Sequence, residues 1–150
     1  MAHTYTSSLF HVVFATKGRR PFMTRDLRAR LWPYLGGIAR DNGMAPLAVG
    51  GTEDHVHLLL GLPATLHIAK AVQLVKGGSS KWVHDSFSEH AGFSWQAGYG
   101  AFTIGISQVE TTRRYIENQE AHHRKTSFMD EFRAILRRHN IEWDEKRIWS

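Results

Sequence analysis

Hydrophobic and polar residues alternate most clearly between residues 51 and 60, where the sequence is GTEDHVHLLL. In a β-strand, successive side chains point to opposite faces of the sheet. His55 and His57 therefore share one face, whereas Val56, Leu58 and Leu60 share the other. The pattern predicts a strand with one face buried in a core and a second face that carries two imidazoles.

Runs of β-branched and aromatic residues bounded by glycine or proline are typical of strands. The predicted strands cover residues 8–15, 44–50, 51–60 and 99–106, and residues 94–96 contribute to the last of them. One helix, capped by Thr24, ends near Gly43, and a second begins at Thr65. This order predicts an α+β, ferredoxin-like βαββαβ fold: an antiparallel sheet with both helices on one face and the other face open.

The second predicted helix contains Gly77 and Gly78, each of which weakens a helix by about 1 kcal/mol. One interpretation is a break in the helix. The other is a close approach of a second backbone, including that of a nucleic acid. The pattern alone leaves both open.

A third helix, predicted over residues 108–125, would cover the open face of the sheet. Tyr115, Gln119 and His122 recur at helical spacing and form one polar stripe. The alternative is a surface helix with an ordinary half-buried tyrosine. Residues 128–138 predict a fourth helix, and the tail from residue 141 to 150, with Trp143 and Trp149, is apolar enough to pack on the domain or on a second subunit.

A length of 150 residues and a hydrophobic content of 42% suit one domain spanning residues 1–150. The absence of cysteine excludes disulfides, thiolate zinc sites and a cysteine nucleophile. No run approaches the roughly 18 apolar residues of a membrane span, and no secretory pattern begins the sequence, so we expect a cytoplasmic protein. No glycine-rich segment has the lysine and hydroxyl residues of a nucleotide-binding loop.

The net charge of +5 and the pI near 9.8 are compatible with a polyanionic partner. Residues 17–30 contain six basic side chains and one acidic side chain, that of Asp26. The basic residues are Lys17, Arg19, Arg20, Arg25, Arg28 and Arg30. Such a cluster suits a phosphate backbone, although a solvated surface of a loop and a helix would have the same composition.

Two imidazoles on one strand face can hold a divalent cation, but a metal normally takes at least a third protein ligand. By itself, the pair formed by His55 and His57 is weak evidence for a metal site, because a structural or merely polar role is the commoner one for such a pair.

The chain resembles the HUH-type single-tyrosine transposases of the smallest bacterial insertion sequences, the insertion sequence 200/605 group. The resemblance rests on five segments in order: residues 10–21, 54–59, 76–80, 95–102 and 115–123. The family's paired histidines match His55 and His57, its helix-borne tyrosine matches Tyr115, and its amide ligand matches Gln119.

The resemblance implies cleavage and rejoining of single-stranded DNA through a 5′-phosphotyrosine on Tyr115. It also implies a divalent metal, Mg²⁺ or Mn²⁺, on His55, His57 and Gln119, and a homodimer that binds hairpin-bearing element ends. No nucleotide cofactor and no membrane are expected. The expected DNA contacts are Lys17, Arg19, Arg20, Lys76, Arg113 and Arg114.

Three alternatives remain. A domesticated, repeat-associated transposase would share all of these residues. A ferredoxin-like nucleic-acid-binding module would lack catalysis, and a metal-dependent hydrolase would use the histidines with an activated water while Tyr115 stayed incidental.

Overall fold

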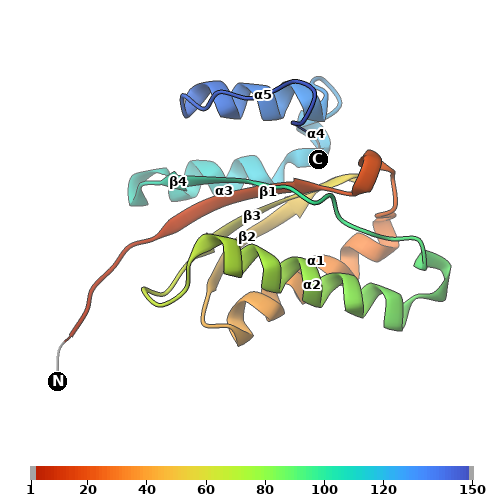
Figure 1. Cartoon of the computed structure of the whole chain (residues 1–150), viewed down its shortest axis with the longest axis horizontal. Helices are drawn as coiled ribbons and strands as arrows, with labels where there is room; N and C mark the ends of the chain where they lie inside the picture. Colours follow the sequence, from red (N-terminus) through yellow and green to blue (C-terminus); the bar gives the residue numbers. More distant parts are fainter. Residues whose placement is uncertain (1–2, 149–150) are drawn as a thin grey trace.

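The computed structural model describes residues 3–148. Its centre is a four-stranded antiparallel sheet with the strand order β2-β3-β1-β4. The strands are β1 (Leu9–Ala15), β2 (Ala45–Gly51), β3 (His55–Gly61) and β4 (Gly100–Ile104). With the two helices α1 (Arg25–Asp41) and α2 (Ile68–Ser86) on one face, this order confirms the predicted ferredoxin-like fold (Figure 1).

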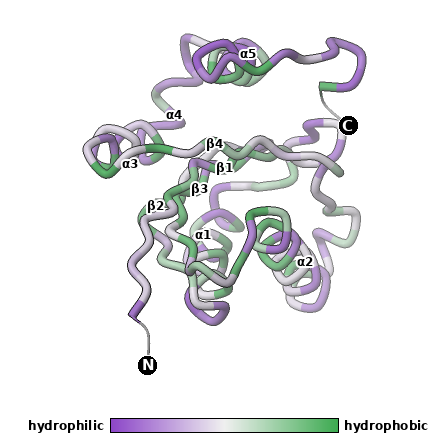
Figure 2. The backbone as a smooth tube through the Cα atoms, turned by 60° about the vertical axis from the view of Figure 1, so that its left-hand side comes forward, coloured by the Kyte–Doolittle hydropathy of each residue, from purple (hydrophilic) through white to green (hydrophobic). Residues whose placement is uncertain are grey.

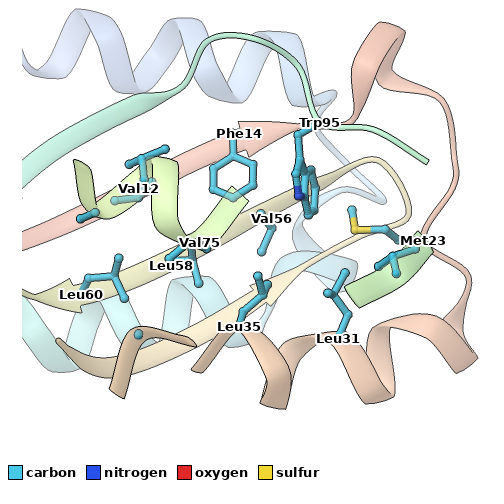
Figure 3. Close-up of a cluster of buried hydrophobic side chains, with 14 of the residues drawn as sticks. Val12, Phe14, Met23, Leu31, Leu35, Val56, Leu58, Leu60, Val75 and Trp95 are labelled. Atoms are coloured by element: carbon cyan, nitrogen blue, oxygen red, sulfur yellow. The ribbon is translucent and has the colours of Figure 1, made fainter. Parts of the chain in front are cut away.

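The main core lies between the sheet and helices α1 and α2. Figure 3 shows Val56, Leu58 and Leu60 of β3 pointing into this core, opposite Leu35 of α1 and Val75 of α2. The alternation predicted for the histidine strand is therefore correct. Thr24 caps α1 as expected, because its hydroxyl accepts a hydrogen bond from the Leu27 amide at 3.2 Å.

The opposite face of the sheet is covered as well, by two separate helices (Figure 2). Helix α3 (Val109–Glu117) packs on the half made by β2 and β3, where its Ile116 is buried. Helix α5 (Phe128–Arg138) packs on the half made by β1 and β4. The predicted tyrosine-bearing helix thus covers only part of this face, and α5 closes the rest.

Two glycines allow these helices to approach the sheet closely. A Cβ atom at Gly50 of β2 would lie 2.9 Å from the carbonyl carbon of Ile116 in α3. A Cβ atom at Gly100 of β4 would lie 2.6 Å from Cε1 of Phe132 in α5. At Gly50 the obstacle is backbone, so this packing requires glycine there, whereas at Gly100 a side chain would force the rings of Phe132 and Phe102 to shift.

Two local predictions differ from the structure. Helix α2 is continuous through Gly77 and Gly78, so of the two interpretations the break is wrong. Gly78 lies against Ile38 of α1, whose Cδ1 is 3.0 Å from an added Cβ. The predicted third helix is divided at Asn118 into α3 and the short helix α4 (Gln119–His122).

The C-terminal tail packs on the hydrophobic cluster that α5 forms with β1 and β4. Trp143 and Ile148 are partly buried against it, as the apolar composition of the tail predicts, whereas Trp149 lies outside the described residues. Within residues 3–148, every helix is too short or too polar to cross a lipid bilayer.

Candidate metal and tyrosine site

The two histidines of β3 lie side by side on the sheet face covered by α3 and α5. In the register with β1, Ala15 lies opposite His55 and Val13 opposite His57. Both imidazoles are fully buried, with 0% exposure. They lie on the sheet face opposite α1 and α2, as expected, but α5 packs over them in addition to the expected tyrosine-bearing helix.

Neighbouring side chains orient His55. Its Nδ1 lies 2.8 Å from Asp54 Oδ1 and 3.0 Å from Thr52 Oγ1. A carboxylate at Nδ1 favours the proton on that nitrogen, which directs the lone pair of Nε2 toward the interior of the site. There, Nε2 lies 2.9 Å from Gln119 Oε1.

His57 is oriented by a third histidine, His11 of β1, whose Nε2 lies 2.7 Å from His57 Nδ1. Burial lowers the pKa of His57 to about 4. Burial, together with the neighbouring His57, lowers the pKa of His11 to about 3. Both imidazoles are therefore neutral near pH 7, which is the form that binds metals.

A buried carboxylate, Glu131 of α5, lies at the centre of the cluster. Its Oε1 is 2.9 Å from His57 Nε2 and 3.1 Å from His123 Nε2. Its Oε2 accepts hydrogen bonds from the Tyr115 hydroxyl and, at 3.1 Å, from Gln119 Nε2. Burial acts to raise the pKa of Glu131, but the hydrogen bonds from His123 and His57 outweigh it and hold the pKa well below its usual range.

Tyr115 and Gln119 enter the site together because they are one helical turn apart. The Gln119 amide donates to the Tyr115 carbonyl at 3.4 Å as well as to Glu131. Burial and the adjacent Glu131 carboxylate raise the pKa of Tyr115 well above its ordinary value. In this arrangement Tyr115 is a neutral phenol, so its conversion to a nucleophile requires a change in its electrostatic surroundings.

The donor set fits a divalent cation. Ligand atoms of His55, His57, His123 and Glu131 all lie within 4.8 Å of one another. The hydrogen bonds that Gln119 donates fix its amide so that Oε1, an acceptor, faces His55 Nε2. With the Nδ1 proton directed toward Asp54, the lone pairs of His55 Nε2 and Gln119 Oε1 face each other at 2.9 Å, and a cation between them would satisfy both.

A hollow of about 600 Å³ opens beside this cluster, and its wall carries four arginines and three acidic residues, Glu53, Asp54 and Glu120. His123 belongs both to the cluster and to the wall of the hollow. The basic residues of the wall are Arg19, Arg25, Arg28 and Arg124. Arg28 is nearly buried and donates to the Met23 carbonyl at 2.6 Å and to Glu120 at 2.9 Å, so this member of the predicted basic cluster also joins α1 to α4.

The residues expected to contact DNA lie in three places. Lys17 and Arg19 belong to the exposed turn η1 (Lys17–Arg19), which Arg20 follows, near the hollow. Arg113 and Arg114 lie on α3, where each is paired with Glu110.

Lys76 lies elsewhere, and its ammonium group is used within the fold. It donates to the carbonyls of Gln96 at 2.8 Å, Ala97 at 3.3 Å and Gly98 at 2.6 Å, and burial lowers the pKa of Lys76 to about 8. These contacts hold the segment before β4 on α2, so the structure does not bring Lys76 to the expected DNA surface.

Three residues of the cluster were missed in the sequence. Alternation along β1 places His11 on the same face as Val13 and Ala15, which lie opposite His57 and His55 in the register. The sequence could therefore have predicted that His11 lies near the histidine pair. Glu131 lies three residues after Phe128 and four before Ile135, on the apolar side of α5. His123 had no comparable signal.

The sequence model of the family described as "Transposase IS200 like" matches residues 4–119, which include the histidine pair, Tyr115 and Gln119. The chain belongs to this family of IS200-like transposases. Helix α5, and with it Glu131, lies beyond the matched residues.

Relatives of known name agree with this membership. The IS200-like chain is 26% identical over 125 residues to the transposase for insertion sequence element IS200 of Salmonella typhimurium, covering 79% of this chain and 81% of that protein. It is 25% identical over 115 residues to the ISDra2 transposase TnpA of Deinococcus radiodurans, covering 73% and 82%.

Two solved structures share the fold of this IS200-like chain. A candidate transposase from Deinococcus radiodurans superposes with a TM-score of 0.63 at 28% identity, covering 79% of this chain and 96% of that one. A REP-associated tyrosine transposase bound to a REP hairpin gives a TM-score of 0.55 at 15% identity, covering 77% and 68%.

Proposed function

We propose that this IS200-like transposase cleaves and rejoins single-stranded DNA through a 5′-phosphotyrosine on Tyr115, with a divalent metal held by His55, His57 and Gln119. The observation that carries the proposal is the convergence of these four residues on one buried centre, although they come from β3, α3 and α4, and β3 lies far from the other two in the sequence. A purely structural histidine pair would not explain a helix-borne phenol and amide directed at the same point.

The proposed reaction exchanges one ester bond for another. The Tyr115 oxygen loses its proton and attacks the phosphorus, the bond from phosphorus to the 3′-oxygen breaks, and the 3′-oxygen takes up one proton and leaves as a free hydroxyl, so that the net number of protons is unchanged. When bound, Mg²⁺ or Mn²⁺ would act as a Lewis acid on the phosphate under attack. Because the tyrosine ester conserves the bond, a 3′-hydroxyl can reverse the reaction without a nucleotide cofactor.

The chain's own residues have distinct tasks in this scheme. Gln119 ties the backbone of Tyr115 to the metal position, and Glu131 accepts the hydrogen bond of the phenol and so holds its direction. Arg19, Arg25 and Arg124 supply positive charge in the adjacent hollow, through which a phosphate backbone would reach Tyr115.

The proposed substrate is the hairpin-bearing end of an insertion sequence, and the proposed working form is a homodimer in the cytoplasm. The related fold that binds a REP hairpin supports a hairpin substrate by analogy of fold. A repeat-associated role predicts preference for chromosomal hairpins over element ends.

The test is formation of a covalent protein–DNA adduct. The purified chain is incubated with single-stranded and duplex hairpin DNA in Mg²⁺ or Mn²⁺, and adducts are mapped by mass spectrometry of tryptic peptides. We expect a nucleotide on Tyr115 with single-stranded DNA only, and Tyr115→Phe should bind this DNA without cleaving it. Full cleavage by Tyr115→Phe would replace this mechanism with hydrolysis by an activated water, and absence of cleavage by the native chain would favour a binding module.

A further inference from the structure

Glu131 is a buried acid that the matched family segment does not contain. Its side chain is 1% exposed, and it projects from the apolar side of α5 between Phe128 and Ile135. A carboxylate in such a place loses its hydration and needs compensating charge or hydrogen bonds. Its ion-pair partners among residues 3–148 are all histidines; no lysine or arginine of this part of the chain pairs with it.

The geometry around Glu131 Oε1 is that of a shared ligand shell. This oxygen lies 2.9 Å from His57 Nε2, 3.1 Å from His123 Nε2 and 3.8 Å from His55 Nε2. Ligands at about 2.1 Å from an octahedral cation are about 3 Å apart when adjacent and about 4.2 Å apart when opposite. The three separations fall close to this range, so a cation can contact all of these atoms with little movement of the side chains.

The second oxygen of the same carboxylate faces the nucleophile. Glu131 Oε2 accepts from the Tyr115 hydroxyl and from Gln119 Nε2 at 3.1 Å. One side chain of α5 therefore contacts both the cation position and the phenol. Since Phe128 and Phe132 pack on the sheet from the same helix, the position of Glu131 depends on the docking of α5.

We propose that Glu131 is a ligand of the catalytic cation through Oε1 and a positioning residue for Tyr115 through Oε2, so that cation binding fastens α5 onto the sheet. The proposal rests on the metal site of the proposed function and extends it to a helix outside the family match. On cation binding, the contact of Oε1 with the cation would replace its hydrogen bonds from His57 and His123. The hydrogen bond from the Tyr115 hydroxyl to Oε2 would be kept.

Direct measurement of Mn²⁺ affinity tests the ligand role without any DNA cleavage. The dissociation constant of Mn²⁺ is obtained for the native chain, for Glu131→Gln and for Asp130→Asn by electron paramagnetic resonance of free Mn²⁺. Asp130 is the matched control, because it precedes Glu131 on α5 but its side chain is 71% exposed. We expect Glu131→Gln to weaken Mn²⁺ binding at least about tenfold and Asp130→Asn to leave it within about twofold.

Hydrogen exchange tests the coupling to α5. In the native chain, Mn²⁺ should slow the exchange of the amides of residues 128–138, and in Glu131→Gln it should not. If Glu131→Gln does not fold, Glu131→Asp is used in its place. Its side chain keeps the negative charge but is shorter by one methylene group, so the carboxylate lies farther from the cation position. This variant should show the same loss of affinity for Mn²⁺.

The outcomes separate this proposal from the proposed function. Equal Mn²⁺ affinity for the native chain and a folded Glu131 variant would overturn the ligand role, while adduct formation on Tyr115 would still stand. Lack of Mn²⁺ binding by the native chain would overturn the metal site of the proposed function itself. Unchanged exchange of α5 on Mn²⁺ binding would overturn the coupling.

Discussion

Substitution of Gly50 by alanine should displace the tyrosine helix while leaving the chemistry of every site residue intact. A Cβ atom at Gly50 would collide with the carbonyl oxygen of Ile116, and it would lie 2.9 Å from the carbonyl carbon and 3.1 Å from Cγ2 of the same residue. Backbone atoms cannot rotate away as a long side chain can. Helix α3 must therefore retreat from β2 by about 1 Å to restore normal contact distances.

The expected cost follows from overpacking. Forcing one extra carbon into a close-packed contact typically costs about 1–3 kcal/mol of unfolding free energy. In a chain of this size, each kcal/mol lowers the melting temperature by roughly 2–4 °C. The effect on adduct formation should be larger, because Tyr115 precedes Ile116 on the same helix and a displacement of about 1 Å can reduce a rate about 100-fold.

Gly37 of α1 provides the matched control, because a Cβ atom there meets nothing within 4 Å. Alanine is better than glycine in a helix by about 1 kcal/mol, so Gly37→Ala should raise the unfolding free energy and leave adduct formation unchanged. Urea titration and gel quantification of the adduct measure the two effects. A Gly50→Ala protein with native stability and native adduct yield would refute the close packing of α3 on β2.

Two further predictions concern pH and the basic side chains. In the folded chain the pKa values of His11 and His57 are about 3 and about 4, below the ordinary 6.5, so the unfolded chain binds more protons between these values. The free energy of unfolding should therefore fall as the pH drops from about 6.5 to 4, by about 1.4 kcal/mol per pH unit for each histidine. Urea titrations from pH 7 to 4 measure this free energy, and a flat profile would contradict the prediction. Lys76→Ala should destabilise the fold by about 1–3 kcal/mol, because it leaves three carbonyls without their donor, and should keep the salt dependence of DNA binding. The double substitution of Arg19 and Arg20 by alanine should instead flatten that dependence by about 0.7 for each phosphate that is no longer neutralised, and an unchanged slope would return these arginines to the role of a solvated surface.

The sheet was predictable because its signals are local. The alternation in β3 predicts that Val56, Leu58 and Leu60 face the core and that His55 and His57 face the other side of the sheet, and the structure has this arrangement. Helix spacing likewise places Tyr115 and Gln119 together, and the hydrogen bond of the amide to the Tyr115 carbonyl preserves the pairing although the helix ends at Glu117.

The errors arose where tertiary packing outweighs local preference. Gly77 and Gly78 weaken an isolated helix, yet α2 continues through them because packing on α1, with Ile38 against Gly78, compensates. Lys76 belongs to a segment that resembles the family, but only the fold shows that its ammonium group donates hydrogen bonds to three backbone carbonyls.

The contribution of α5 shows which signal was available and not used. On an amphipathic helix, residues at i, i+4, i+7 and i+8 share the buried side, and Phe128, Phe132, Ile135 and Leu136 follow this spacing. Glu131, at i+3, falls on the same side, where an unpaired carboxylate would cost several kcal/mol. A helix that tolerates such a residue must bury it against donors or a cation, and the predicted open side of the sheet offers two histidines for that purpose. The acid on the apolar side of α5 was thus a signal that this helix packs against a polar partner, and in the structure the partners are the imidazoles of β3 and His123.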